Sequence, residues 1–571
     1  MIGVRALVIG PLVAAILLTA CAKVDNDPDE WIYDGPVNAC GAGSGCAVGD
    51  CDTELGACVV SPPVGQTLLA RVVPATGAPA QVYSVAVVGG TIGGAFPVQM
   101  PVTVTGRTIV GEGDDTSSLT GRVVLADVGN RLPGRPAQVT VYESYDSEVF
   151  DLELLPSAYD VIVIPEYPQS MYCPIYYLPP VTLDATGVFR DSGGDPKDVV
   201  VPRAAAYVKG QIRLADAPVV GLEMVAFDPE TGRILSTVGE TDGAVCEGSE
   251  CGLFEIGLAK SLYEPGEEGS TFSLRASRPS EPHHPVFEAE GFIPPAAGET
   301  LKLIGDAAPA FGSLGVPVRF QATVVQPVRT QMGVDVFDTA PSCFVLFSSA
   351  DVADGAVEKW VLTNESGELE ETSGVTGVNL YPGAYAITVI PAGAPVGSTN
   401  DYAVYTSLEP LAITEDNVPG EVELSLDWRP MVAGQVSAGS LPVPTSVVSA
   451  HPAAGAPESA RSNSAMSGGS GAFRFWLDEA PYIVVAEAPA ESRYAWDVAE
   501  ASVPVEALSL PLELPLPFVL RGAVEASADQ VNPIDVAGSV VEWYREIDGR
   551  AYAVGRTVAD EDGRFAALLP P

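Results

Sequence analysis

Glycine and proline interrupt this chain so often that they limit what it can fold into. The 571 residues include 58 glycines and 50 prolines, so few segments avoid both for long enough to form a sizeable helix. Between these breaks, apolar and polar residues alternate. In EVELSLDW, at residues 421–428, the apolar side chains fall on one face of an extended chain: Val422, Leu424, Leu426 and Trp428. A period of two is typical of a strand buried on one side, which indicates an all-β protein.

Three local patterns recur from about residue 116 onward. A valine-rich run around a glycine, which would open each module, occurs at Gly121, Gly210, Gly434 and Gly522, with a degenerate copy around Phe320. A polar turn that leads into an aromatic strand occurs at Gly252, Gly471 and Gly563. A strand that carries a tyrosine occurs at Tyr159, Tyr385 and Tyr482, with a looser copy at Phe272. These repeats predict a series of small, similar β modules.

The order of these patterns resembles the carboxypeptidase regulatory-like domain, a transthyretin-like sandwich, and is similar to the collagen-adhesin B-type repeats of bacterial surfaces. The resemblance covers most of residues 116–571 and implies tandem Ig-like or transthyretin-like β-sandwiches with a structural or binding role. We expect a small β module at 63–115 and sandwiches at 116–205, 206–315, 316–430, 431–518 and 519–571.

The last of these modules ends before its tyrosine strand. We therefore expect residues 519–571 to be an incomplete sandwich, either truncated or finished by a partner. Because the missing strand would leave an unpaired sheet edge and an open apolar face, this module is predicted to be the least stable part of the protein.

The N-terminus has the features of an export signal. Arg5 precedes an apolar run that is too short for a comfortable membrane span. LTAC at residues 18–21 resembles the lipobox of bacterial lipoproteins, which implies that residues 1–20 are a signal peptide and that Cys21 carries a lipid. By the same resemblance, Ala22 favours the outer membrane. The alternative is an ordinary secretory cleavage site that is followed by a cysteine.

Eight of the nine cysteines follow Cys21, an even number that favours disulfide bonds in an exported protein. Residues 21–62 form an acidic tether and a glycine-rich knot with four of them: Cys40, Cys46, Cys51 and Cys58. Their spacing does not favour a zinc site, and three disulfide pairings are possible. A bond between Cys246 and Cys251 would close a hairpin loop. The last two either pair with each other or stay buried as small apolar side chains: Cys173 and Cys343.

Charge and histidine content exclude several functions. With 29 Lys+Arg against 74 Asp+Glu, the formal net charge is −45, which repels nucleic acid. His283, His284 and His451 are the three histidines, and none starts a zinc-binding H-x-x-E motif or accompanies a G-x-S-x-G elbow. We therefore expect no catalytic site, metal or cofactor. Lys209 has no matching asparagine for an isopeptide cross-link.

Together these features predict a lipid-anchored cell-envelope protein that acts as a structural spacer or adhesin. Its expected partners are the membrane, through the lipid, and a surface glycan or protein. The alternative is a carbohydrate- or peptide-binding accessory lipoprotein, because transthyretin-like sandwiches share their architecture with starch-binding-like modules. Its candidate contacts are Tyr172, Tyr176 and Tyr177, unless these pack beneath the proline-rich loop that contains them.

Overall fold

The computed structural model describes residues 33–571 apart from the segments 42–45, 76–77, 105–107, 113–114, 145–151, 168, 191–192, 194–198, 216, 242–250, 264–270, 282–283, 330–334, 373, 392–401, 415–421, 458–459, 505–506 and 528–535. Short strands make up most of this part of the chain. The helices described there are short 3-10 segments: η1 (Gln169–Met171), η3 (Lys260–Tyr263), η4 (Gly305–Ala307) and η5 (Ala490–Ser492). None of them has the length and apolar character needed to cross a membrane. The all-β fold class is confirmed.

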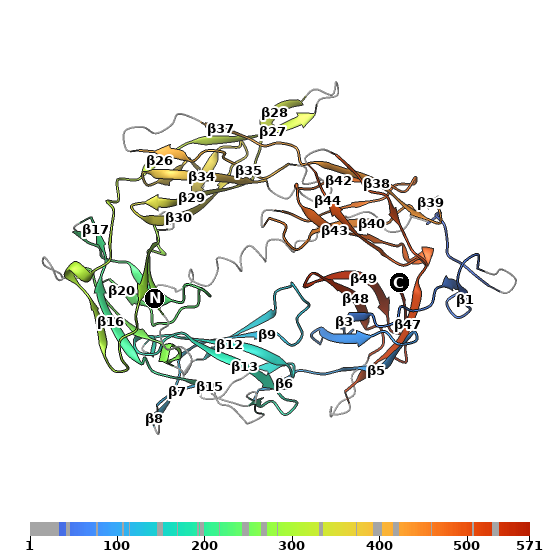
Figure 1. The fold of residues 1–571 in the computed structure, drawn as a ribbon, viewed down its shortest axis with the longest axis horizontal. Helices are drawn as coiled ribbons and strands as arrows, with labels where there is room; N and C mark the ends of the chain where they lie inside the picture. The colour runs from blue at the N-terminus through green and yellow to red at the C-terminus, as the bar shows by residue number, and fades with distance from the viewer. Residues whose placement is uncertain are drawn as a thin grey trace.

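Five β-sandwiches follow one another around a ring (Figure 1). Each has its own buried apolar core. Four consist of continuous chain, and we name them sandwich 1 (residues 102–201), sandwich 2 (206–311), sandwich 3 (318–426) and sandwich 4 (431–514). The fifth, which we name the closing sandwich, combines residues 67–98 with residues 518–569.

Sandwich 4 shows the common topology. Its first sheet contains β38 (Met431–Ala438), β39 (Leu441–Pro442), β42 (Ala472–Trp476), β45 (Leu508–Ser509) and β46 (Leu512–Glu513). Its second sheet contains β40 (Val447–Pro452), β41 (Asn463–Met466), β43 (Pro481–Glu487) and β44 (Asp497–Ser502), in the order β41-β40-β43-β44. The opening strand β38 pairs antiparallel with β42 and parallel with β45 and β46.

The closing sandwich repeats this topology with strands from both ends of the described chain. They are β3 (Thr67–Val73), β4 (Gln81–Ala86), β5 (Thr91–Val98), β47 (Phe518–Ala526), β48 (Val540–Ile547), β49 (Arg550–Val558) and β50 (Arg564–Leu569). The opening strand β47 pairs antiparallel with β50 and parallel with β5. The second sheet has the order β4-β3-β48-β49. Strands β3, β4 and β5 therefore take the positions that β43, β44 and the β45–β46 pair hold in sandwich 4.

This arrangement corrects the expectation for the two ends. Residues 63–115 are not a separate module, and residues 519–571 are not an incomplete one. The strand missing after β50 is β3, which lies between β4 and β48 and so leaves no open edge at that position. Leu68 and Phe96 pack with Trp543 in a single core. The repeat pattern did not reveal this pairing because β3 carries no tyrosine and precedes its partners by most of the chain.

Sandwich 1 starts earlier than the repeat pattern predicted. Its strands are β6 (Val102–Thr103), β7 (Thr108–Glu112), β8 (Asp115–Ser118), β9 (Gly121–Asp127), β10 (Gln138–Ser144), β11 (Glu153–Leu154), β12 (Ala158–Pro165), β13 (Tyr176–Leu183), β14 (Phe189–Arg190) and β15 (Val199–Val201). The parallel partner of its closing strand β15 is β7. The strand at Gly121, β9, instead pairs with the tyrosine strand β12 in the other sheet. Gly121 is therefore not equivalent to the other opening glycines, and the boundary at 116 was wrong.

Sandwiches 2 and 3 follow the same plan. Sandwich 2 contains β16 (Ala206–Gln211), β21 (Leu253–Leu258) and β24 (Thr300–Leu303), facing β19 (Glu223–Phe227), β20 (Gly239–Glu240), β22 (Phe272–Ser277) and β23 (Phe287–Phe292). Sandwich 3 contains β27 (Ala322–Arg329), β28 (Asp335–Thr339) and β37 (Val422–Ser425), facing a sheet built around β29 (Phe344–Val352), β30 (Gly355–Thr363), β31 (Leu369–Thr372) and β34 (Gly383–Ile390). In Figure 1, the sheets with β9, β20, β30, β43 and β48 lie toward the centre of the ring.

An aromatic side chain on the neighbouring strand explains the opening glycines. Gly434 lies opposite Phe473, and Gly522 lies opposite Phe565. A Cβ on Gly434 would be 2.7 Å from Phe473 Cζ, and one on Gly522 would be 2.6 Å from Phe565 Cζ. A larger residue would therefore displace the phenyl group from the core, and this is why the glycine and the aromatic strand recur together.

The repeated tyrosines lie in the cores and bond to backbone four residues upstream. The hydroxyl groups of Tyr159 and Tyr385 each donate to such a carbonyl oxygen at 2.9 Å. The Tyr482 hydroxyl instead accepts a hydrogen bond from the backbone amide of Asp478 at 3.2 Å. This contact resembles the tyrosine corner of other β-sandwiches, and it fixes the turn that leads into the strand.

Each continuous sandwich contacts the next. Sandwiches 1 and 2 share a small apolar cluster: Ile164, Ile175, Val225 and Ile234. Sandwiches 2 and 3 exchange two backbone hydrogen bonds between Val286 and Ala356. Between sandwiches 3 and 4, Arg461 Nη2 donates to Tyr402 O at 2.5 Å. Arg461 also pairs with Asp478, which accepts a hydrogen bond of 2.8 Å from the buried guanidinium of Arg429 in the linker between the two sandwiches.

The closing sandwich completes the ring because it contacts sandwiches 4 and 1. On one side, Tyr552 packs with Ile483 and Val485 of sandwich 4. On the other side, Leu132 of sandwich 1 packs against Tyr544, and a backbone hydrogen bond of 2.9 Å joins Ala551 N to Pro133 O. The strands at the two ends of the described chain thus hold five sandwiches in a closed arrangement.

Candidate functional site

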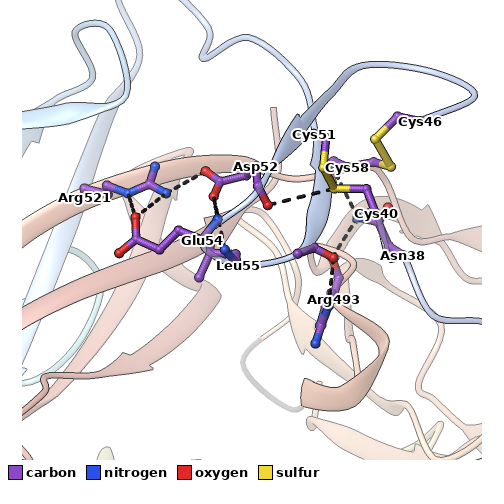
Figure 2. Close-up of a disulfide and its surroundings, with 11 residues drawn as sticks. Asn38, Cys40, Cys46, Cys51, Asp52, Glu54, Leu55, Cys58, Arg493 and Arg521 are labelled. Atoms are coloured by element: carbon purple, nitrogen blue, oxygen red, sulfur yellow. Dashed lines mark hydrogen bonds and ion pairs between the residues drawn. A yellow bond between two sulfur atoms is a disulfide. The ribbon is translucent and has the colours of Figure 1, made fainter. Parts of the chain in front are cut away.

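The cysteine-rich segment is a short hairpin with two disulfide bonds. Its strands are β1 (Asp50–Asp52) and β2 (Ala57–Val59). The disulfide bonds that the cysteine content favoured join Cys40 to Cys51 and Cys46 to Cys58 (Figure 2). The sulfur atoms of Cys40, Cys46 and Cys58 lie close together, but as disulfide sulfurs they are not thiolate ligands for a metal ion.

This segment sits on the joint between sandwich 4 and the closing sandwich. On the sandwich 4 side, the Arg493 guanidinium donates to Gly56 O at 2.7 Å. The buried Asn38 amide donates to Cys58 O at 2.8 Å and to Arg493 O at 3.0 Å. These are hydrogen bonds to neutral carbonyl groups, so this attachment does not require an ionised acid.

On the closing-sandwich side, Val60 packs against the core and the attachment includes an ion pair. Arg521 Nη2 is 2.6 Å from Asp52 Oδ2 and 3.2 Å from Glu54 Oε2 (Figure 2). Burial acts to raise the pKa of Asp52, but hydrogen bonds from Arg521 and from the Leu55 and Glu54 amides outweigh it, so the pKa is lowered. The segment therefore connects the two sandwiches that meet where the ring closes.

The remaining cysteines differ in their surroundings. Cys21 and Cys246 lie outside the described residues, and Cys251 is disulfide-bonded. Cys173 and Cys343 are buried in the cores of sandwiches 1 and 3, so they do not pair with each other. Burial raises the pKa of the Cys173 thiol to about 11, which keeps it protonated and unreactive near neutral pH.

A groove of about 600 Å³ lies between sandwiches 1 and 2. Two of the three candidate tyrosines, Tyr176 and Tyr177, line it, together with charged residues from both sandwiches: Asp160, Asp228, Glu230 and Arg233. Tyr172 does not line it. Tyr172 packs against the core of sandwich 1, and the Arg203 guanidinium lies 5.3 Å from the centre of its ring.

Tyr177 joins the two sandwiches. Its hydroxyl accepts a hydrogen bond from Ile234 N at 3.3 Å, and the Arg233 guanidinium lies 5.4 Å from its ring centre. Burial raises the pKa of Tyr177, although this bond and Arg233 oppose the shift. Tyr176 packs in part against the sandwich 1 core. These tyrosines are half-buried, so packing accounts for much of their role.

The charged groove residues were missed because local sequence does not show which sandwich faces which. Asp228 begins a turn, DPETGR, in which the Thr231 hydroxyl donates to its carboxylate at 2.6 Å. Burial acts to raise the pKa of Asp228, but hydrogen bonds from Thr231 and from the Glu230 amide lower it overall. The sequence DPETGR indicates a turn, but its position in the groove depends on how sandwich 2 packs on sandwich 1.

Two other residues that we considered for chemistry have structural contacts. His284 is buried at the junction of sandwiches 2 and 3, where its ring meets Phe287 and Tyr381 edge-on. Lys209 forms an exposed ion pair of 2.9 Å with Glu255 on the adjacent strand. His283 lies outside the described residues.

No family model and no curated protein sequence matches this chain. Among solved structures, it is similar to the TIE protein of Bacillus anthracis, with 11% identity, coverage of 73% of this chain and 75% of the other, and a TM-score of 0.17. A streptococcal ancillary pilin is 10% identical over 54% of this chain and 98% of its own, with a TM-score of 0.19. The pilus adhesin SpaC of Lactobacillus rhamnosus GG is 11% identical over 70% and 56%, with a TM-score of 0.15. Similarity at this level identifies neither a family nor an activity.

Proposed function

We propose that this chain is a non-catalytic, lipid-anchored protein of the bacterial cell envelope that holds binding surfaces in a fixed ring. The observation that carries the proposal is that strands from the two ends of the described chain share one sandwich. Such a ring keeps the distances between its surfaces constant, which suits a scaffold or adhesin better than an extensible spacer. Because these surfaces are ordered before a ligand binds, the entropic cost of binding is smaller.

The anchor is supported by the lipobox-like LTAC at residues 18–21. The disulfide-bonded segment follows it in the sequence and is attached where the ring closes. A lipid on Cys21 would therefore hold the ring at one point on its circumference.

Replacing Cys21 tests the anchor. We expect Cys21→Ala to move the protein from the membrane fraction to the soluble envelope fraction, because the lipid is the proposed attachment. The matched control, Ala22→Ser, leaves the cysteine in place and should remain with the membranes. A Cys21→Ala protein that still sediments with membranes after a high-salt wash would contradict lipid anchoring.

A second candidate function, binding of a carbohydrate, is favoured by the groove between sandwiches 1 and 2. Its volume of about 600 Å³ lies in the usual range for ligand sites. Tyr176 could stack on a sugar ring, while Asp160 and Asp228 could accept hydrogen bonds from sugar hydroxyls. Calorimetry with maltoheptaose and cellohexaose tests this idea. We expect Tyr176→Ala to abolish binding and the exposed Tyr167→Ala to preserve it; an intact Tyr176→Ala response, or no binding of either sugar, would remove the candidate.

A further inference from the structure

A second, smaller cavity lies where three sandwiches meet. Its volume is about 160 Å³. The loop between β9 and β10 contributes Arg135, sandwich 4 contributes His451 and Ser462, and the closing sandwich contributes Arg550 and Tyr552. Because no single sandwich supplies these side chains, the cavity exists only in the closed ring.

The charged side chains that line this cavity are positive, whereas the net charge of the protein is negative. The chain has 74 acidic and 29 basic residues, yet among the described residues the cavity is lined by two arginines and by no carboxylate. Burial lowers the pKa of His451, and Arg135 lowers it further, as a positive potential would. An acidic residue does lie nearby. Burial raises the pKa of Tyr552, and Asp548, at the turn between β48 and β49, also acts to raise it.

Contacts between the sandwiches hold the donor groups in place. Arg550 Nη1 donates to Pro452 O at 2.8 Å, and the Arg550 side chain also bonds to Tyr552. A guanidinium group carries five N–H donors, so Arg550 can still donate to a ligand beside these two contacts. The Arg135 guanidinium lies 6.0 Å from the ring centre of Tyr544. Ser462 Oγ is 3.4 Å from His451 Nδ1. No described carboxylate bonds to the imidazole of His451, so this Ser-His pair lacks the orienting group of a catalytic triad.

We propose that this cavity binds a single oxyanionic group, such as a carboxylate, sulfate or phosphate. Arg135 and Arg550 would supply charge-assisted hydrogen bonds, and Ser462 and His451 would add neutral donors. The cavity is smaller than the roughly 300 Å³ that organic ligands usually need, but it holds several water volumes of about 30 Å³ each, which is enough for one such group. Because three sandwiches form the site, a bound anion stabilises the closed ring by mass action. This inference does not depend on the lipid anchor or on the groove.

The test uses the three histidines as reporters in the full-length protein, labelled at histidine Cε1 and purified in detergent. Sodium sulfate and sodium acetate are titrated separately, with sodium chloride holding the ionic strength constant because salt screens exposed charges. We expect saturable shifts of the His451 signal and a rise of its pKa with anion, while the His284 signal stays fixed. A response to sulfate alone would indicate a tetrahedral group, and a response to both would indicate oxyanions in general.

Variants separate binding from folding. Arg135→Gln should weaken sulfate binding about tenfold, because it removes a charge-assisted contact. It leaves the described backbone contacts between sandwiches in place, although the contact of Arg135 with the Tyr544 ring is lost as well. The control is Arg564→Gln in the closing sandwich, whose side chain is 74% exposed and does not line the cavity. It should bind sulfate like the parent. Absence of a saturable His451 shift with either anion, or equal affinities of the Arg135→Gln variant and the parent, would overturn the proposal.

Discussion

Sandwich 4 and the closing sandwich have the same topology but differ in how the chain supplies their strands. Sandwich 4 takes all its strands from residues 431–514, whereas the closing sandwich combines residues 67–98 with residues 518–569. The break falls between the aromatic strand β50 and the strand equivalent to the tyrosine strand. The sheet order is unchanged by the break, so the pairing preferences of the strands, and not their connection, determine this fold.

The difference has a consequence for stability. Contacts within sandwich 4 are relatively local, so it can form before the rest of the chain is ordered. The closing sandwich needs contacts between residues separated by most of the sequence, and their formation carries a larger loop-closure entropy. We therefore expect the closing sandwich to form last during folding and to depend on both of its halves.

Deleting residues 63–100 should produce the largest difference in stability between the two sandwiches. The variant lacks β3, β4 and β5, so β48 loses its partner β3, β47 loses its partner β5, and an apolar core is opened. We expect residues 518–569 to lose amide exchange protection while residues 431–514 keep it. A peptide of residues 63–100, added separately, should restore that protection. Unchanged protection of residues 518–569 after the deletion would show that these strands are stable without their N-terminal partners.

Truncating a core aromatic residue in each sandwich should have the next largest effect. Trp543 is fully buried in the closing sandwich and Phe475 in sandwich 4, so each change to alanine should cost about 3–5 kcal/mol. We expect Trp543→Ala to reduce exchange protection in residues 67–86 and 540–558 together, because these residues share one core. Phe475→Ala should first affect residues 431–514. If Trp543→Ala affected only the C-terminal half, the two halves would not unfold as one unit.

The comparison of sandwich 4 with the closing sandwich also shows which parts of the fold could be predicted from the sequence. Alternation and turns predicted the all-β fold, and the recurring patterns at Gly434, Phe473 and Tyr482 reflect real contacts in the cores. Those patterns are local, and strand pairing is not. Gly121 matched the opening pattern but lies in the opposite sheet, since a valine-rich strand fits either one. The partner of β48 carried no recognisable pattern, which is why the end modules were assigned incorrectly.

The candidate sites were predicted less completely. The cysteine count favoured disulfide bonds but left three pairings open, because the choice depends on how the hairpin folds. The tyrosines of the groove were named, whereas Asp228 and Arg233 were not. The cavity around His451 brings together three sandwiches, so no single stretch of sequence could indicate it.

Replacing the opening glycines should give a smaller but graded effect. A Cβ on Gly434 would overlap the Leu510 carbonyl as well as Phe473. The backbone at Leu510 cannot move as easily as a side chain can. A Cβ on Gly522 would meet the side chains of Ile92 and Phe565, which can move. We expect Gly434→Ala to cost more than Gly522→Ala, within the range of about 1–3 kcal/mol for overpacking, as measured by urea unfolding. Equal costs would contradict this explanation of the glycines.

The smallest expected effect distinguishes the two attachments of the cysteine-rich segment. Asp52 bonds to Arg521 of the closing sandwich, whereas Asn38 attaches the segment to sandwich 4 through groups that do not titrate in acid. The pKa of Asp52 is lowered in the folded protein. Its stabilising contribution is therefore complete above its unfolded-state pKa of about 4 and is lost as the pH falls through the lower folded value. Acid should loosen the segment from the closing sandwich first.

We expect this contribution to be about 0.2–1 kcal/mol, because Arg521 is 36% exposed and water screens the pair. Asp52→Asn removes the titrating group, so protection of the Leu55 amide should become lower and independent of pH between about pH 5 and pH 2, where the parent loses protection. Glu54→Gln is the matched control. Glu54 is 76% exposed, so this variant should keep the pH dependence of the parent. If Asp52→Asn retained that dependence and Glu54→Gln lost it, the acid-sensitive contact would be Glu54, and Asp52 would not be the residue that couples the segment to the closing sandwich.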